Sequence, residues 1–298
     1  MATAKTEFQT FLTEEIKKVR GVYYPVKAGF LRRVLVKRAP FTSLHPNPND
    51  EFCFPEIGPN YEIISNYEHE FRQLEVDKGA AFFVKKGADE PVIVEKTRPD
   101  GYMLLNGHHR WAAARRVGVP KMKIKIVDLT QEKDIRKMLE KSRSDKRVTL
   151  DLDEVILRPE GDACLEKALP FPMSRIYKER IRMGTPALFH FLKTKGYDIW
   201  VYTAQYYSLE YLKHYFKYYR VDVTGIVTGA GRKGEKESDG KVEKMLEKKY
   251  STTLHIENDH VLQITKGTKE YEDRQLSGNP STWASEVMDA IGEMKQHE

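Results

Sequence analysis

The second half of the chain alternates short apolar, β-branched segments with amphipathic helical segments, and this alternation constrains the fold more than any other feature. It predicts strands at residues 148–151, 198–202, 221–227 and 253–256 and helices at 186–195, 208–219, 241–249 and 282–294. Such an order favours a parallel sheet with right-handed crossovers. Ligands of these sheets bind at the carboxyl ends of the strands. We therefore expect an α/β domain with its site at one edge of the sheet.

The first half has a different pattern, which predicts a smaller α+β domain. We expect an amphipathic helix at residues 5–19, a strand-like segment at 23–37, a Pro- and Asn-rich loop at 43–60, strands at 91–96, 102–105 and 122–127, and a helix at 108–117. A highly charged helix at 131–147 then runs into a linker. A length of 298 residues also suggests two domains. We place the boundary near residue 145, which gives domains 1–145 and 146–298.

Composition excludes several classes of protein. Aromatic residues make up 11% of the chain, too many for a largely disordered protein. The longest apolar run, residues 80–84, is far shorter than the ~20 residues that cross a bilayer. The first ten residues lack the apolar core of a secretion signal. Cys53 and Cys164 lie far apart without metal spacing. These features predict a cytoplasmic protein without a membrane partner.

The charge balance permits binding of anions. The formal net charge is +6, with 50 basic and 44 acidic residues. Because the two signs are interspersed, the sequence supports nucleic acid as a partner only weakly. The charge also permits a phosphorylated small molecule or a nucleotide, which we expect as the partner.

Acidic and hydroxyl side chains follow the expected strands of the second half, at the point where each strand ends. Asp151 and Asp153 follow the first strand, Thr203 follows the second, and residues 257–259 (Glu-Asn-Asp) follow the last. Carboxylates that meet at one sheet edge repel one another unless a cation joins them, and oxygen ligands suit Mg²⁺. Asp151 could then attack phosphorus, while Asp153 protonates the leaving oxygen. Thr203 and Lys241 would hold the phosphoryl oxygens.

These motifs resemble those of haloacid dehalogenase-type (HAD) hydrolases. The matching segments are DLDEV at 151–155, VYTAQ at 201–205, Lys241, and LHIEND at 254–259. The resemblance covers roughly residues 147–297 and implies a Rossmann-like fold, Mg²⁺ and an aspartyl-phosphate intermediate. It makes Asp151 the nucleophile and Asp153 the acid/base.

The same resemblance implies a metal site formed by Asp151, the main-chain carbonyl of Asp153, and Asp259. The sequence departs from the family pattern at two positions, since Glu154 stands where Gly is usual and Asn258 where Asp is common. Glu257 and Asn258 therefore remain alternative metal ligands. Lys233 and Lys236 remain alternatives to Lys241 as the phosphate-binding lysine.

A second candidate site lies at residues 106–110 (Asn-Gly-His-His-Arg), where an expected strand turns into an expected helix. Main-chain N–H groups at the start of a helix attract phosphate, and His108, His109 and Arg110 would add donors. Asn106 and Gly107 form the turn that precedes them. The residues therefore predict a site for a nucleotide or another anion. In an alternative interpretation, the two histidines cap and pack the helix start.

This segment resembles the ParB/sulfiredoxin-like superfamily, whose signature is a strand, a G-x-[HR]-R turn and an Ala-rich helix. The Asn-Gly-His-His-Arg version is most similar to the free serine kinases of that superfamily. The resemblance covers about residues 33–130 and implies binding of ATP or another nucleotide with Mg²⁺. It also implies an upstream acidic base, for which Glu51 and Asp50 are the nearest candidates.

Together these features predict a Mg²⁺-dependent phosphomonoester hydrolase fused to a nucleotide-binding or kinase domain, and thus a bifunctional kinase and phosphatase in the sharpest form of the hypothesis. Two alternatives remain. One is a nucleotide-sensing regulatory protein whose HAD half is inactive. The other is a phosphatase that processes the ends of nucleic acids.

Overall fold

The computed structural model describes residues 2–76, 87–158, 162–230, 236–267 and 271–294. Within them the chain divides into two compact units, a first that extends to Asp128 and a second that begins at Leu129. The sequence placed this division near residue 145. The difference is helix α5 (Glu132–Lys141), whose Ile135 and Met138 are buried in the hydrophobic core of the second unit.

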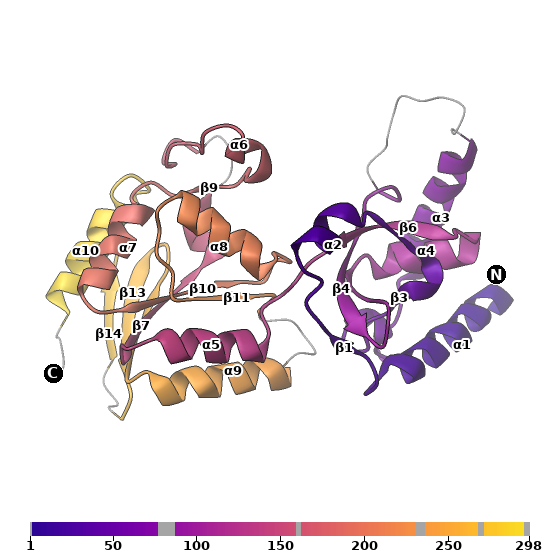
Figure 1. Cartoon of the computed structure of the whole chain (residues 1–298), viewed down its shortest axis with the longest axis horizontal. Coiled ribbons are helices and arrows are strands. Elements are labelled where there is room, and N and C mark those ends of the chain that lie inside the picture. Colours follow the sequence, from indigo (N-terminus) through magenta and orange to yellow (C-terminus); the bar gives the residue numbers. More distant parts are fainter. Residues whose placement is uncertain (1, 77–86, 159–161, 231–235, 268–270, 295–298) are drawn as a thin grey trace. The chain divides into compact units, whose positions relative to one another are not determined.

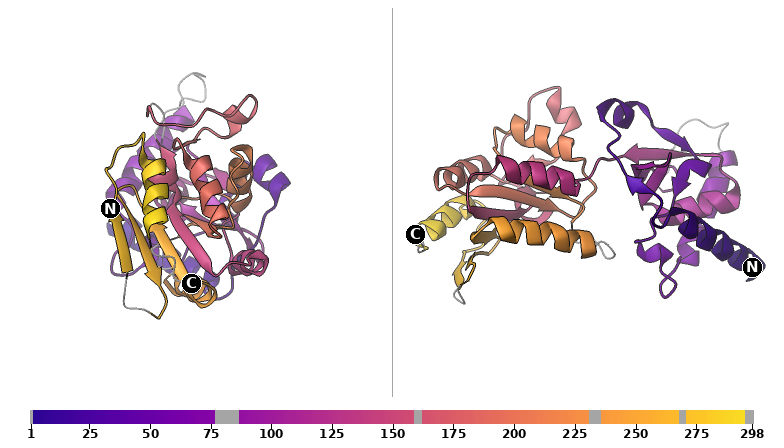
Figure 2. Two further views of the ribbon diagram at one scale, coloured as in Figure 1. Left: turned by 90° about the vertical axis from the view of Figure 1, so that its left-hand side faces the viewer. Right: turned by 60° about the horizontal axis from the view of Figure 1, so that its bottom comes forward.

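The second unit is built on one six-stranded sheet with the order β11-β10-β7-β12-β13-β14. Four strands are parallel: β7 (Lys146–Asp151), β10 (Asp198–Thr203), β11 (Gly225–Thr228) and β12 (Thr252–Ile256). The parallel α/β arrangement expected from the sequence is therefore observed. Strands β13 (His260–Thr265) and β14 (Tyr271–Gln275) add an antiparallel extension beside β12, which the sequence analysis did not predict (Figure 2).

Helices cover both faces of this sheet (Figure 1). Helix α5 lies beside α9 (Lys236–Lys249) on one face, and α7 (Thr185–Thr194), α8 (Leu209–Tyr218) and α10 (Trp283–Glu293) lie on the other. Between β7 and β10 the chain also forms a two-stranded hairpin, β8 (Leu157–Arg158) with β9 (Arg180–Ile181), and the short helix α6 (Met173–Ile176).

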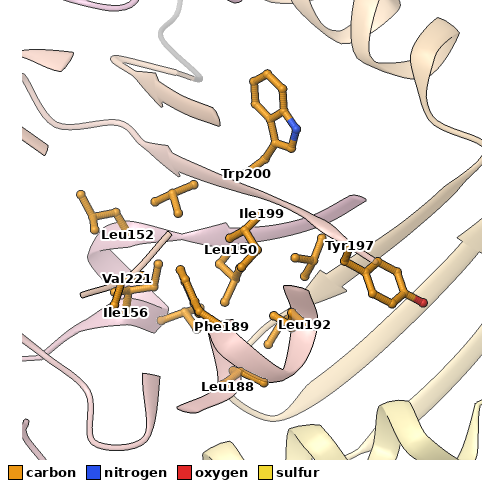
Figure 3. Packing of buried hydrophobic residues seen from close by; sticks show 14 of the residues in the cluster. Leu150, Leu152, Ile156, Leu188, Phe189, Leu192, Tyr197, Ile199, Trp200 and Val221 are labelled. Carbon is orange, nitrogen blue, oxygen red and sulfur yellow. The ribbon is translucent and has the colours of Figure 1, made fainter. Parts of the chain in front are cut away.

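Alternation along the central strands fills the core. Figure 3 shows Leu150 and Ile199 on the side of the sheet where Leu188 and Leu192 of α7 pack, while Trp200 points to the opposite side. All five side chains are buried. Because successive residues of a strand face opposite sides, both faces of β7 and β10 are fixed by packing. This fixes the register that brings the ends of the two strands together.

The first unit also contains a six-stranded sheet, which mixes parallel and antiparallel strands in the order β2-β6-β4-β5-β3, with β1 paired to β4. Its strands are β1 (Tyr24–Pro25), β2 (Arg38–Pro40), β3 (Leu44–His45), β4 (Val92–Arg98), β5 (Tyr102–Asn106) and β6 (Lys121–Ile126). Its helices are α1 (Ala2–Val19), α2 (Phe30–Leu35), α3 (Tyr61–Val76) and α4 (His108–Val117). The buried ring of Trp111 on α4 stacks on Phe11 and Phe41, which anchors α1 to this unit.

The strand-like prediction for residues 23–37 is wrong for most of the segment. Only Tyr24 and Pro25 form a strand, and residues 30–35 form helix α2. Its apolar side chains, Phe30, Leu31, Val34 and Leu35, recur at helical spacing, so they share one face of a helix rather than alternating across a strand.

No helix in the described part of the chain has both the length and the apolar character needed to cross a membrane.

The central strands should carry most of the stability of the second unit. Leu254 on β12 is fully buried, whereas Ile264 on β13 is 43% exposed. We expect Leu254→Ala to lower the free energy of unfolding by about 2–5 kcal/mol, because it removes buried methyl groups and leaves a cavity. Ile264→Ala should change it by only about 0.5 kcal/mol. Urea unfolding followed by ¹⁹F NMR of fluorotryptophan at Trp200 and Trp283 would measure both, and equal losses would contradict the assigned core.

Candidate active site

Asp151 ends the central strand β7, and its carboxylate is held by the turn that follows. Its Oδ1 accepts hydrogen bonds from the main-chain N–H groups of Asp153 and Glu154, both at 2.7 Å. The turn is a single π-helical turn, Leu152–Ile156, in which Leu152, Val155 and Ile156 are buried. These apolar anchors fix the turn, so Asp151 is oriented by main-chain donors. No hydrogen-bond partner for Oδ2 of Asp151 occurs among the described residues.

Asp153 and Thr203 meet across two neighbouring strands. The Thr203 hydroxyl, at the end of β10, donates to Oδ2 of Asp153 at 2.6 Å and accepts from the N–H of Gln205 at 3.0 Å. Burial raises the pKa of the Asp153 carboxyl, the hydrogen bond from Thr203 opposes this shift, and the negative charge of nearby Asp151 adds to it. A carboxyl with a raised pKa retains its proton at higher pH, which suits a general acid.

The strand order places this pair at a reversal of the sheet. From β7 the chain passes to β10 and β11 on one side, and it then crosses to β12 on the other side of β7. The crevice between such strands is the usual ligand position in open α/β sheets. A cavity of about 680 Å³ opens at this edge of the sheet, and neither Asp153 nor Thr203 is among its described lining residues. Asp151 and Glu154 line it from the end of β7, and residues 257–259 line it from the end of β12.

Polar residues of β7, β12 and α9 also line this cavity, which the sequence analysis missed. Arg147 on β7 is buried and donates to Oε1 of Glu243 at 2.7 Å and to Oγ1 of Thr253 at 2.9 Å. Thr149 is 2.7 Å from Nδ1 of His255, whose pKa is lowered by burial. Arg147, Thr149 and Asp151 occupy every second position of β7, and this period of two was the signal for a polar face.

The end of β12 brings together acidic side chains and a histidine. Nδ1 of His260 lies 2.8 Å from Oδ1 of Asp259, and this contact raises the pKa of His260. Glu257, Asp259 and His260 are the one set of three His, Cys, Asp or Glu side chains in the described ranges whose possible ligand atoms lie within 4.8 Å of one another.

Asp151 and Asp153 are not part of that set. The side chains of Asp151, Asp153 and Asp259 therefore do not converge as three carboxylates on one point, although Asp151 and Asp259 line the same cavity. Asn258 also lines the cavity and is already engaged, since it accepts from Arg182 and donates to the Glu154 carbonyl.

The expected phosphate-binding lysine is not part of the cavity lining that the structure describes. Lys241 is exposed on α9, and its charge acts on Glu132 of α5. Lys233 lies outside the described residues, and Lys236 begins α9 with a side chain that also lies outside them. Thr203 lies at the end of β10 as expected, but its side chain is buried, donates to Asp153 and is not part of the described cavity lining. Lys241 is directed elsewhere.

The second candidate site, residues 106–110, surrounds the start of α4 in the first unit. Gly107 precedes the helix with φ +96°, and a Cβ there would lie 2.6 Å from Cγ1 of Val92, so this turn requires glycine. Arg110 is buried and donates to the main-chain carbonyl of Glu90 at 2.8 Å, with Nη2 3.5 Å from Oδ1 of Asn106. The guanidinium of Arg110 therefore joins α4 to the segment that precedes β4.

Both histidines have structural partners. Nε2 of His108 accepts from the N–H of Asn47 at 3.3 Å, and Nε2 of His109 accepts from the N–H of Asn60 at 3.2 Å. Burial lowers the pKa of His108 to about 4, against the opposing charge of Asp50. Burial also lowers the pKa of His109. Two neutral rings that accept main-chain hydrogen bonds match the interpretation in which they cap and pack the helix start.

The acidic candidates for a kinase base lie next to these rings. Oδ1 of Asp50 is 3.6 Å from Nδ1 of His108. Glu51 begins the short 3₁₀ turn Glu51–Cys53, and the Phe52 ring in this turn contacts both histidines. The structure thus brings Asp50 and the turn that carries Glu51 to the start of α4.

Comparison with known proteins supports one part of this picture. Residues 64–142 match the ParB N-terminal domain, which includes β4, β5, α4 and β6. The chain is also similar to an uncharacterized protein, MJ0188, of Methanocaldococcus jannaschii, with 40% identity over 121 residues. That similarity covers 40% of this chain and 38% of the relative, so the chain spans well under half of that protein. No solved structure matches the chain. The ParB-like resemblance is thus confirmed for residues 64–142.

The buried neutral histidines make the first unit sensitive to acid. The pKa of His108 is about 4 in the folded protein and near 6.5 when unfolded, so the unfolded state binds more protons between these values. We expect the free energy of unfolding of this unit to fall as the pH drops from about 6.5 to about 4. His108→Gln should weaken this dependence, whereas His69→Gln, at an exposed position of α3, should not. Urea unfolding followed by ¹⁹F NMR at Trp111 would measure it, and an unchanged slope in His108→Gln would contradict the assignment.

Proposed function

We propose that the second unit is a Mg²⁺-dependent phosphomonoester hydrolase of the HAD type. The observation that carries this proposal is the arrangement of Asp151, Asp153 and Thr203 at the carboxyl ends of β7 and β10. One carboxylate is oriented by two main-chain N–H groups, and its neighbour is a carboxyl with a raised pKa. The oriented carboxylate of Asp151 suits a nucleophile, and the carboxyl of Asp153 suits a general acid.

The reaction would proceed in two steps. Oδ2 of Asp151 attacks phosphorus, the P–O bond to the alcohol breaks, and Asp153 gives its proton to the departing oxygen. In the second step Asp153, now ionised, takes a proton from water as the water oxygen attacks the phosphorus of the Asp151 phosphate. The bond between phosphorus and Asp151 breaks, inorganic phosphate leaves, and both side chains return to their starting states. Thr203 keeps Asp153 in place through both steps.

The oxygen atoms at this edge of the sheet suit Mg²⁺. Asp151 and the main-chain carbonyl of Asp153 would hold the ion, and the carboxylates of Glu257 and Asp259 open on the same cavity. When bound, the ion neutralises the charge of the phosphate group and of the carboxylates around it.

For the first unit we propose a binding role for a nucleotide or phosphate group, supported by the match to the ParB N-terminal domain. Main-chain N–H groups at the start of α4 would provide the site. We do not extend the proposal to a kinase, because the side chains expected to hold phosphate are engaged within the unit. Arg110 bonds to Glu90, and the two histidines accept from Asn47 and Asn60.

Asp151→Asn tests the nucleophile. We expect this variant to keep its fold and to lose more than about 10³-fold in the rate of phosphate release, because an amide cannot form the covalent intermediate. The assay is phosphate release from p-nitrophenyl phosphate and from a panel of metabolites and nucleotides, with Mg²⁺. Asp222→Asn, which is exposed on the loop before β11, is the matched control and should behave like the unchanged protein. Full activity in Asp151→Asn would refute the proposal.

Asp153→Asn tests the general acid. The variant should hydrolyse alkyl phosphates about 10²- to 10⁴-fold more slowly, because an alkoxide needs a proton to leave. The rate of the first step with p-nitrophenyl phosphate should fall much less, since p-nitrophenolate leaves without needing a proton. The measurement is the single-turnover rate on both substrates, and an equal loss on the two would exclude Asp153 as the acid.

A further inference from the structure

Beneath the acidic residues at the end of β12 lies a buried arginine that neither the sequence motifs nor the proposed reaction uses. Arg182, directly after β9, is 1% exposed. Its Nη1 donates to Oδ1 of Asn258 at 2.8 Å, and its guanidinium stacks on the ring of Trp283 at 4.2 Å. Trp283 in turn donates from Nε1 to the main-chain carbonyl of Glu257 at 3.0 Å.

Asn258, which Arg182 holds, also contacts the turn that follows Asp151. Its Nδ2 donates to the main-chain carbonyl of Glu154 at 3.2 Å. A guanidinium can only donate and a carbonyl can only accept, so the two partners fix which end of the amide faces which. An amide side chain meets both requirements. An aspartate could accept from Arg182, but it could not donate to Glu154.

The last link returns to the proposed nucleophile. The N–H of Glu154 donates to Oδ1 of Asp151, and its carbonyl is the group that Asn258 holds. One residue of the turn is therefore fixed at both ends, by Asp151 and by Asn258. Glu154 is itself exposed, so packing of its side chain does not hold this part of the turn.

We propose that Arg182 is a positioning residue, which acts through Asn258 and Glu154 to hold the carboxylate of Asp151 in its reactive orientation. This inference rests on the proposed phosphatase function. It also explains the departure at residue 258 from the aspartate that is common in the HAD motif. In this chain the amide of Asn258 links the buried Arg182 to the main chain of Glu154, and a carboxylate at residue 258 would break the second of these bonds.

The burial of Arg182 is consistent with this role. Desolvation lowers its pKa to about 10, and the positive charge of Arg158 contributes to the shift. No hydrogen-bond partner for its Nε occurs among the described residues. Burying a charge with incomplete hydrogen bonding is costly, and an apolar residue of similar size often stabilises such a site. The arginine is thus poorly explained by stability alone.

The decisive variant is Asn258→Asp, which moves the sequence toward the common family pattern. We expect the pair with Arg182 to persist and the bond to Glu154 to be lost. The variant should keep its melting temperature, lose about 10- to 100-fold in kcat with p-nitrophenyl phosphate, and change little in KM, because the nucleophile is misaligned rather than removed. Asn66→Asp, the same change at an exposed position of α3, is the matched control and should change neither constant.

A second measurement does not depend on activity. Hydrogen exchange of the amides in Leu152–Ile156 should accelerate in Asn258→Asp and in Arg182→Met, and it should remain slow in the control. When Asn258→Asp and Arg182→Met are combined, the loss in kcat should not exceed the larger of the two single losses, because both residues act through one turn. Arg182→Lys should restore part of the activity lost in Arg182→Met.

The two measurements separate the possible failures. If the unchanged protein hydrolyses no phosphomonoester, the proposed function fails, while accelerated exchange in Asn258→Asp would still establish the link to the turn. If the unchanged protein is active and Asn258→Asp matches it in both kcat and exchange, the positioning role of Arg182 is overturned. The positioning role is also overturned if the fold-losses in kcat of Asn258→Asp and Arg182→Met multiply in the double variant, because independent effects add as free energies.

Discussion

The pair of hydrogen bonds from main-chain N–H groups to Asp151 is the interaction on which the candidate site depends. They exist because β7 ends at the centre of the sheet and continues at once into a tight turn whose apolar residues are buried. Burial of Leu152, Val155 and Ile156 thus determines where a carboxylate points. The chemistry proposed for this edge follows from packing beneath it.

The electrostatics of the same edge follow from its place at a sheet reversal. Asp151, Glu154, Glu257 and Asp259 all line one cavity, which concentrates negative charge there. The structure offsets part of this charge through His260, which contacts Asp259, and through Arg182, which lies below. The remaining excess of carboxylates attracts a divalent cation, and it would disfavour a phosphate group in the absence of one.

The candidate sites of the two units differ in whether their polar side chains are already engaged in hydrogen bonds. At the start of α4, a histidine pair and an arginine resemble an anion site in the sequence, yet each makes hydrogen bonds within its own unit. At the end of β7, Asp151 and Glu154 line a cavity, and Oδ2 of Asp151 has no hydrogen-bond partner among the described residues. The side chains of a motif therefore support a binding function only when their polar atoms are not already used to hold the fold together.

The sequence alone determined the α/β class of the second unit, its four parallel strands, the ParB-like segment, and the placement of Asp151, Asp153 and Thr203 at the ends of neighbouring strands. These features depend on local periodicity and on the alternation of elements along the chain, which are properties of nearby residues. Strands β13 and β14 were missed, because short segments of mixed polarity carry little periodic signal. Helix α2 was predicted as a strand, because its six residues make fewer than two helical turns.

Only the tertiary structure decided which polar groups are engaged. The direction of Lys241, the bonds of Arg110 and the contact of Arg182 with Asn258 join residues whose separations in sequence carry no pattern; Arg182 and Asn258, for example, are brought together across the carboxyl ends of the strands. Hydrogen bonds are directional and act over about 3 Å, so a residue type can indicate a capacity to bind, but only packing places its partner within reach.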